Sequence, residues 1–196
     1  MKSLFLKLKK ASKPFLKKGI KDIIVFGSFM RGKQDYKDID ILLVFEEKVD
    51  KDLEVEYRKK LNKITNKVDV TSKTKKNYKD SSFIAREGIL FEGYSIKSNE
   101  FFSTKYGFRG LGFFFYKTNN LNNRQKTKFY YALNGRNTMG VLESLNGFKV
   151  SDNVIAFPID KIDPAKEFLD FWKLDYRYVP TLIPERLAKK RFIGKD

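Results

Sequence analysis

Residues 27–45, GSFMRGKQDYKDIDILLVF, place two aspartates at the start of an apolar run. Residues 38–45 have the composition of a buried strand. Because side chains of a strand alternate between its two faces, Asp38 and Asp40 are expected on the same face. A shorter apolar run, residues 23–26, comes just before and ends at the first glycine of the quoted stretch, as is typical of a central strand followed by a tight turn. The stretch therefore predicts two strands with a pair of carboxylates at one end.

Two carboxylates this close repel each other, which raises the pKa of one of them or requires a cation. A divalent ion bound by oxygen ligands is the usual solution, and Mg²⁺ fits best. A third acid, Asp69, lies between Val68 and Val70 in another apolar segment. If that segment pairs beside residues 38–45, the three acids can bind metal and leave one carboxylate to accept a proton.

The composition excludes several classes of chemistry. The 196 residues contain no cysteine and no histidine, so disulfides, thiolate or imidazole metal sites and Ser-His or Cys-His nucleophiles are excluded. Hydrophobic residues make up 41% of the chain, which excludes a disordered protein, and no apolar run reaches the about eighteen residues of a membrane-spanning helix. The formal net charge of +17 would attract a polyanion or an anionic nucleotide.

Residues 1–21 contain no acid and carry apolar side chains at roughly helical spacing, which predicts a basic amphipathic helix. Lysines interrupt the apolar side chains too early for a signal peptide, so the protein is expected to stay in the cytoplasm without inserting into a membrane. The helix could dock on a membrane surface. The simpler interpretation is that its apolar face packs on the sheet that follows.

The order of apolar and polar segments predicts two lobes, residues 1–96 and residues 97–196. In the first lobe, the expected elements beyond those above are a helix that follows Ser28, helices at residues 51–66 and 77–88, and a strand at residues 68–70. The second, smaller α/β lobe follows a loop at residues 97–110. Its expected elements are helices at residues 127–134, 139–145 and 163–174 and strands at residues 153–159 and 176–183.

The turn at Gly27-Ser28 supplies the other half of a nucleotide site. A strand that ends in Gly-Ser and enters a helix presents backbone N–H groups and a hydroxyl to a phosphate. No Gly-Lys-Ser/Thr follows, so this is not a Walker A loop. Arg31 and Lys33 lie just beyond the turn and are expected to reach the outer phosphates.

Together these features resemble the DNA polymerase beta-like nucleotidyltransferase superfamily, and specifically its minimal nucleotidyltransferases. The resemblance covers about residues 20–96. The residues that carry it are Gly27-Ser28, the following Met30-Arg31-Gly32, the group Asp38-Ile39-Asp40 and a separate strand with Asp69.

The resemblance implies an α+β fold with a mixed sheet flanked by helices, and a Mg²⁺-dependent nucleotidyltransferase. In such an enzyme Asp38 and Asp40 would bind two metal ions that carry a nucleoside triphosphate. Asp69, also a metal ligand, would position or deprotonate the acceptor hydroxyl. Gly27 and Ser28 would hold phosphate.

The second lobe is expected to select the acceptor. Residues 123–131, NRQKTKFYY, interleave bases with aromatic side chains, which suits phosphate contact and base stacking. The basic side chains considered for RNA contact are Arg124, Lys126, Lys128 and Arg136. Alternatively, Phe129, Tyr130 and Leu133 are simply part of a hydrophobic core.

Three functions stay open on the sequence. The favoured one is transfer of a nucleoside monophosphate from a triphosphate to a hydroxyl on RNA, with release of pyrophosphate. The second is modification of a protein or a small molecule, as in antitoxin-like members that add AMP to a partner toxin. The third is a catalytically silent module that binds RNA.

Overall fold

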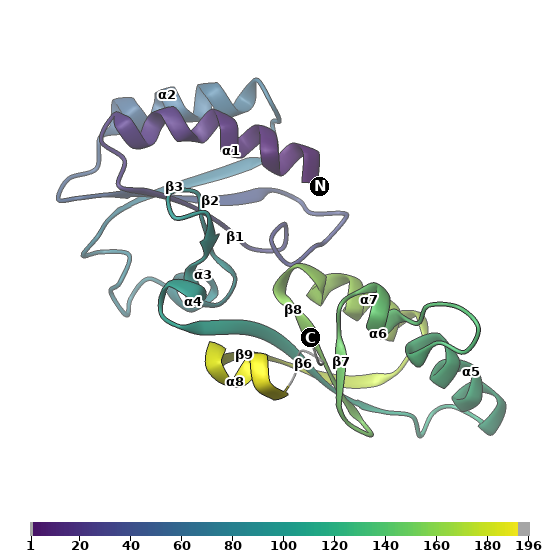
Figure 1. The fold of residues 1–196 in the computed structure, drawn as a ribbon. Coiled ribbons are helices and arrows are strands. Elements are labelled where there is room, and N and C mark those ends of the chain that lie inside the picture. Colours follow the sequence, from purple (N-terminus) through teal and green to yellow (C-terminus); the bar gives the residue numbers. More distant parts are fainter. Residues whose placement is uncertain (1, 192–196) are drawn as a thin grey trace. The chain divides into compact units, whose positions relative to one another are not determined.

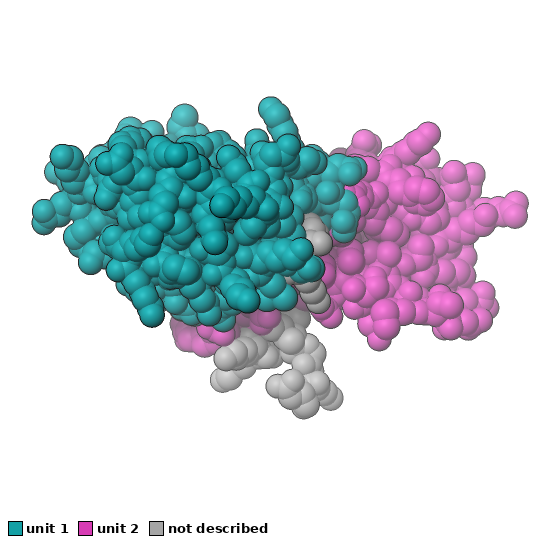
Figure 2. All heavy atoms as spheres, turned by 90° about the horizontal axis from the view of Figure 1, so that it is seen from above, with its two compact units in different colours: residues 1–106 teal, residues 107–196 magenta. Residues whose placement is uncertain are grey.

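The computed structural model describes residues 2–191 and divides the chain into two units, residues 1–106 and 107–196 (Figure 2). The sequence predicted the boundary between the two lobes after Ile96. The first unit extends further because β5 (Glu100–Phe101) pairs with β4 (Tyr94–Ser95), and α4 (Phe102–Lys105) contacts α3 (Arg86–Glu92). The segment expected to be a loop therefore completes the first unit.

The first unit is built on a five-stranded mixed sheet in the order β3-β2-β1-β4-β5. Its three long strands are β1 (Asp22–Phe26), β2 (Ile39–Phe45) and β3 (Val68–Thr74). β1 pairs with β2 antiparallel, whereas β2 and β3 are parallel. Helices α1 (Lys2–Lys17) and α2 (Lys51–Asn62) cover one face of the sheet, and α3 with α4 lie on the other face (Figure 1). This α+β arrangement confirms the predicted fold class.

The lysine-rich helix α1 packs on the sheet, as the simpler interpretation predicted. Its side chains Leu8, Ala11 and Phe15 are buried in a cluster that also contains Ile23 and Val25 of β1. The spacing of these residues along α1 places them on one side of the helix, while most of its lysines are exposed. Burial of apolar surface against the sheet thus explains why this short, highly charged helix is stable.

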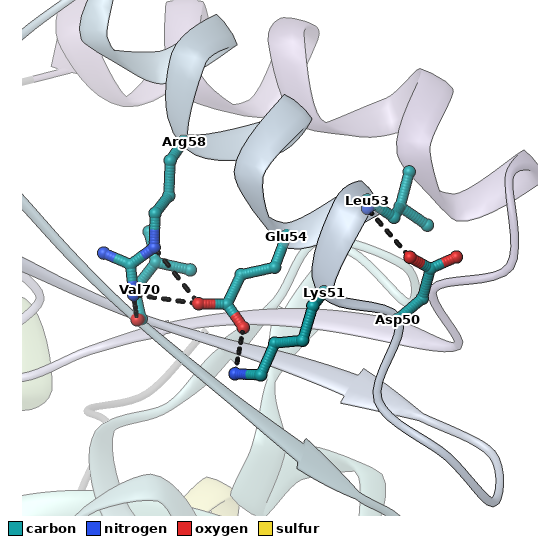
Figure 3. A network of polar contacts seen from close by, with 6 residues as sticks. All are labelled: Asp50, Lys51, Leu53, Glu54, Arg58 and Val70. Carbon is teal, nitrogen blue, oxygen red and sulfur yellow. Dashed lines mark hydrogen bonds and ion pairs between the residues drawn. The ribbon is translucent and has the colours of Figure 1, made fainter.

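A polar network attaches α2 to β3 (Figure 3). The carboxylate of Asp50 caps α2 by accepting the N–H of Leu53 at 2.9 Å. The buried carboxylate of Glu54 accepts hydrogen bonds from Lys51 at 3.0 Å and from Arg58 at 3.1 and 3.2 Å. Arg58 also donates to the carbonyl of Val70. The network fixes the helix over β3, close to the position of Asp69.

Two helices predicted in the first unit do not form as expected. Residues 28–33 make a series of turns instead of a helix, in which the carbonyl of Gly27 accepts the N–H groups of Met30 and Arg31 at 3.0 and 3.3 Å. Gly32 then adopts a φ of +89°, which a continuing right-handed helix does not allow.

The helix predicted at residues 77–88 is also absent over most of that range, and α3 begins only at Arg86. Side chains in this segment bond to nearby backbone in place of helix formation. Thr74 accepts the N–H of Asn77 at 3.2 Å, and Asp80 accepts the N–H of Ser82 at 2.8 Å. These local bonds explain why the apolar spacing was misleading.

The second unit is a four-stranded antiparallel sheet in the order β7-β8-β6-β9, with helices on it (Figure 1). Its core contains Phe114, Ile155, Phe157 and Leu169. Its elements are β6 (Phe108–Lys117), α5 (Asn123–Asn134), α6 (Val141–Ser144), β7 (Phe148–Ser151), β8 (Val154–Pro158), η1 (Ile159–Lys161), α7 (Ile162–Phe171), β9 (Asp175–Pro184) and α8 (Glu185–Arg191). Among residues 2–191, no helix combines the length and the apolar character needed to cross a membrane.

Candidate active site

The three acids singled out in the sequence lie at one end of the three long strands. Asp40 is directly opposite Phe26 of β1 on one side and Asp69 of β3 on the other. Neighbouring strands are about 4.8 Å apart, so the carboxylates of Asp40 and Asp69 project side by side from the same face. Asp38 immediately precedes β2, which begins at Ile39 and not at Asp38 as predicted. Asp69 is exposed, although its apolar neighbours indicated burial.

Asp40 has the most perturbed carboxylate of the cluster. Its pKa rises from 3.8 to about 6, first because the group is half-buried and then because Asp38, Asp69 and Glu92 are nearby. The guanidinium of Arg31 opposes this rise in the pKa of Asp40. The folded chain therefore concentrates negative charge around Asp40, and this is an arrangement that a bound cation would stabilise.

The turn after β1 brings backbone directly against Asp40. Gly27 has a φ of +79°, and a Cβ atom at this position would overlap the Oδ2 atom of Asp40. Glycine permits this backbone conformation without strain and leaves the carboxylate of Asp40 in place. In the part of the chain that the structure describes, the N–H groups of Ser28 and Phe29 have no hydrogen-bond acceptor. These two N–H groups are therefore available to an anion, although the turn does not lead into the predicted helix.

Arg31 is held by an acid that no local sequence pattern indicates. Its Nη1 atom donates to both carboxylate oxygens of Glu92 in α3, at 2.7 and 2.8 Å. Glu92 is only 6% exposed, and it lies 61 residues further along the chain. Lys33, by contrast, is exposed. The predicted phosphate ligands thus differ: Lys33 is accessible, whereas Arg31 is positioned by a buried ion pair beside Asp40.

The carboxylates match the chemistry of a hard divalent cation in donor type. All of them offer oxygen, and the pKa of Asp40 is raised first by burial and then by the neighbouring negative charges. Within residues 2–191, however, no group of three or more acidic side chains is arranged closely enough to hold a metal ion by itself. Mg²⁺ is usually bound by one or two carboxylates together with the phosphates of a nucleotide, so the pair of Asp40 and Asp69 fits a cation that arrives with its substrate.

The residues considered for RNA contact lie in the second unit. Arg124, Lys126 and Lys128 lie on α5 and Arg136 follows it; all four are exposed. The Arg136 guanidinium lies 4.8 Å from the ring centroid of the exposed Tyr131.

The aromatic residues of α5 divide between core and surface. Phe129 is buried against Tyr116, Phe168 and Trp172, with ring centroids 5.5 to 5.8 Å apart, and Leu133 is buried as well. Tyr130, expected in the core under the alternative interpretation, is 56% exposed. The helix thus has an apolar side in the core and a basic, aromatic side in solvent.

Comparison with known proteins adds to this geometry. Residues 9–95 match the model of the family described as Polymerase beta, Nucleotidyltransferase. A solved toxin–antitoxin structure with AMP-PNP is similar at 20% identity over 50% of this chain and 82% of that chain, with a TM-score of 0.36. A mutant of the toxin–antitoxin MntA–HpeT is similar at 18% identity over 50% of this chain and 81% of that chain, with a TM-score of 0.35. A comparison with curated proteins gives no match.

The family match spans β1, the turn at Gly27, β2 and β3, which are the elements that bring Asp40 and Asp69 together. Residues 9–95 of this chain are therefore a nucleotidyltransferase domain of the polymerase beta family.

Proposed function

We propose that the protein transfers a nucleoside monophosphate from a nucleoside triphosphate to an acceptor hydroxyl, with Asp38, Asp40 and Asp69 as its catalytic carboxylates. The observation that carries this proposal is the alignment of Asp40 with Asp69 on neighbouring strands, beside a glycine turn that contacts Asp40. This alignment favours a working site over a catalytically silent module.

Each residue has a role in the proposed reaction. The oxygen of the acceptor hydroxyl bonds to the α-phosphorus, the bond from this phosphorus to the bridging oxygen of the β-phosphate breaks, and pyrophosphate leaves. Asp69 is exposed and accepts the proton of the hydroxyl. Backbone N–H groups at Ser28 and Phe29 contact the phosphates, and Lys33 compensates the charge of the leaving pyrophosphate.

Asp38, Asp40 and Asp69 are also the residues that would hold Mg²⁺. Two Mg²⁺ ions held by these carboxylates would supply charge compensation for the attacking and leaving oxygens. Arg31 contributes to phosphate binding, and its bond with Glu92 keeps the guanidinium beside Asp40. The ion pair would thus position Arg31 as a ligand for phosphate.

RNA is the acceptor that we favour. The net charge of +17 suits a polyanion, and α5 exposes tyrosines beside basic side chains, as proteins that stack on unpaired bases do. Arg124, Lys126, Lys128 and Arg136 would contact the phosphates of the RNA.

The test is transfer of label from each α-labelled nucleoside triphosphate, with Mg²⁺, into total cellular RNA and protein. The matched comparison is the Asp38→Asn/Asp40→Asn variant, which keeps the size of both side chains. Labelled RNA with the wild type and none with the variant supports the proposal in full. Labelled protein would replace RNA by a protein acceptor, as in antitoxin-like members, and no label in any acceptor would contradict the proposed transfer.

A further inference from the structure

A cavity lies at the other end of the sheet that carries the acids. Its volume is about 500 Å³, and the residues that line it include Asp22, Ile24 and Val44. Asp22 is opposite Val44, whereas Phe26, at the far end of β1, is opposite Asp40. Four residues of extended chain separate these two ends, a distance of about 13 Å. The cavity is thus separate from the carboxylates of the candidate active site.

The walls of this cavity are strongly basic. Five lysines come from four separate parts of the first unit: Lys21, Lys75, Lys79, Lys97 and Lys105. In the described chain, the amines of Lys79, Lys97 and Lys105 form no ion pair with an acid. Cations gathered around one hollow repel each other, so an anion bound there would stabilise the fold.

The acids near the cavity are already engaged. Asp22, which lines the cavity, accepts a hydrogen bond from the hydroxyl of Ser95, which lies 2.8 Å from each of its carboxylate oxygens. It also accepts a hydrogen bond from the N–H of Ile23 at 2.8 Å. The carboxylate of Glu46 accepts a hydrogen bond from the amine of Lys75 at 2.7 Å and forms an ion pair with the amine of Lys21 at 3.5 Å. These acids offset part of the charge of Lys21 and Lys75 and leave the other lysines to a ligand.

One wall of the cavity is aromatic. The ring of Phe102 lies between Tyr78 and Tyr106, at centroid distances of 6.3 and 5.4 Å. The Tyr78 hydroxyl can donate a hydrogen bond at neutral pH, as any tyrosine can, and burial, followed by Tyr106 and Asp22, raises its pKa further. Tyr106 is 49% exposed, which leaves part of its ring accessible to a ligand.

We propose that this cavity is a second nucleotide-binding site, in which the lysines hold the phosphates and Tyr106 stacks on the base. A cluster of lysines alone would fit any anion. The aromatic wall beside it adds the contact that a planar base requires. A free nucleotide and a nucleotide within single-stranded RNA both carry this chemistry, and the two sources are separated by the ligands used in the test.

The test is equilibrium dialysis of the full chain, without metal, against labelled ATP and against a labelled short oligouridylate. Lys97→Gln/Lys105→Gln is the variant, and Lys10→Gln/Lys13→Gln is the control, since it removes the same charge from exposed positions of α1. We expect the cavity variant to weaken binding of one ligand by roughly ten-fold or more, and the control to change it much less. Loss of ATP binding assigns the cavity to free nucleotide, and loss restricted to oligouridylate assigns it to RNA.

A second variant separates stacking from charge. Tyr106→Leu is expected to weaken several-fold the binding of the same nucleotide ligand that the lysine variant weakens, ATP or oligouridylate, while leaving the binding of inorganic tripolyphosphate unchanged. If the Lys97→Gln/Lys105→Gln variant binds both nucleotide ligands as the control does, the proposed site is wrong. If Tyr106→Leu leaves the affinity for that nucleotide ligand unchanged, the cavity binds phosphate without recognising a base, and the assignment to a nucleotide is wrong.

Discussion

At the scale of single residues, Asp40 is the group whose position is hardest to explain by stability. Its carboxylate is half-buried beside Asp38, Asp69 and Glu92, and all of these effects disfavour its charge. A residue kept in such a position is typical of a site that binds a cation or substrate, because the ligand compensates the repulsion.

Asp40→Asn should therefore make the metal-free protein more stable at high pH. The pKa of Asp40 rises from 3.8 to about 6 on folding, so the stability that its proton contributes is lost as the pH rises through about 6. At about pH 8 we expect a gain of roughly 1 kcal/mol in the free energy of unfolding, allowing for solvent screening of this half-exposed group, and at about pH 4 no gain. Urea denaturation with a chelator measures both. If the variant is less stable than the wild type at the higher pH, the inference that the charge of Asp40 destabilises the metal-free protein is wrong.

Gly27→Ala should remove activity by displacing the carboxylate of Asp40. An alanine at a φ of +79° costs about 1 kcal/mol of stability, and its Cβ overlaps Oδ2 of Asp40. Misplacement of a catalytic group by about 1 Å lowers rates by roughly 100-fold. Gly107→Ala is the control, because Gly107 has a φ of +74° but open space around its Cβ position. Equal losses of transfer activity in the two variants would mean that strain alone is responsible.

Much of the candidate site can be predicted from the residues themselves. The apolar residues around Asp69 predicted a third strand, and the pairing of this strand beside β2, which the sequence left as a condition, aligns Asp69 with Asp40. The period of two does not apply to Asp38, because Asp38 precedes β2, although it contributes after burial to the raised pKa of Asp40. Glu92 could not be predicted, because its contact with Arg31 spans 61 residues and leaves no local pattern. The exposure of Asp69 was missed for a related reason, since β3 is at the edge of the sheet.

At the scale of elements, the ion pair of Arg31 and Glu92 joins the turn after β1 to α3. Glu92 is buried and accepts both bonds from one guanidinium nitrogen, so removal of either partner leaves a poorly solvated charge. The pair therefore fixes the position of the turn relative to the helix.

A double-mutant cycle with Arg31→Gln and Glu92→Gln should give a coupling energy of roughly 1.5–3 kcal/mol in the free energy of unfolding. The pair of Lys18 and Glu56 provides the control, with a distance of 2.6 Å but side chains about half exposed. Its cycle should give less than about 1 kcal/mol. Thermal or urea denaturation of the wild type and the six variants measures both couplings. Similar values for the two pairs would argue against an anchoring role for Arg31.

The elements also show where sequence patterns succeed and fail. Predominantly apolar strands such as β1 and β2 were predicted nearly to the residue, because their burial leaves a clear pattern. The structure of residues 77–85, a segment rich in short polar side chains, was not predicted correctly, because hydrogen bonds from side chains to the backbone compete with helix formation. The contribution of β5 and α4 to the first unit depends on pairing with β4, which the sequence of residues 97–106 does not reveal.

At the scale of the whole molecule, the charge of +17 predicts how RNA binding should depend on salt. Each phosphate contact releases a counterion, so affinity for single-stranded RNA should fall by roughly ten-fold or more between about 50 and about 200 mM salt. Arg124→Gln/Lys128→Gln/Arg136→Gln should lower the affinity and flatten this dependence, unlike Lys10→Gln/Lys13→Gln on α1. Filter binding at several salt concentrations measures both slopes. Binding that is insensitive to salt would count against RNA as the acceptor.

In the proposed reaction, the polymerase beta-type domain transfers a nucleoside monophosphate through the acids around Asp40. The most direct measurement compares ATP labelled at the α-phosphate with ATP labelled at the γ-phosphate, using purified protein, Mg²⁺ and total cellular RNA and protein. The α-label should enter an acceptor, the γ-label should appear as pyrophosphate, and both should disappear in Asp38→Asn/Asp40→Asn. Entry of the γ-label into the acceptor, or transfer of the α-label that survives in the variant, would contradict nucleoside monophosphate transfer through these acids.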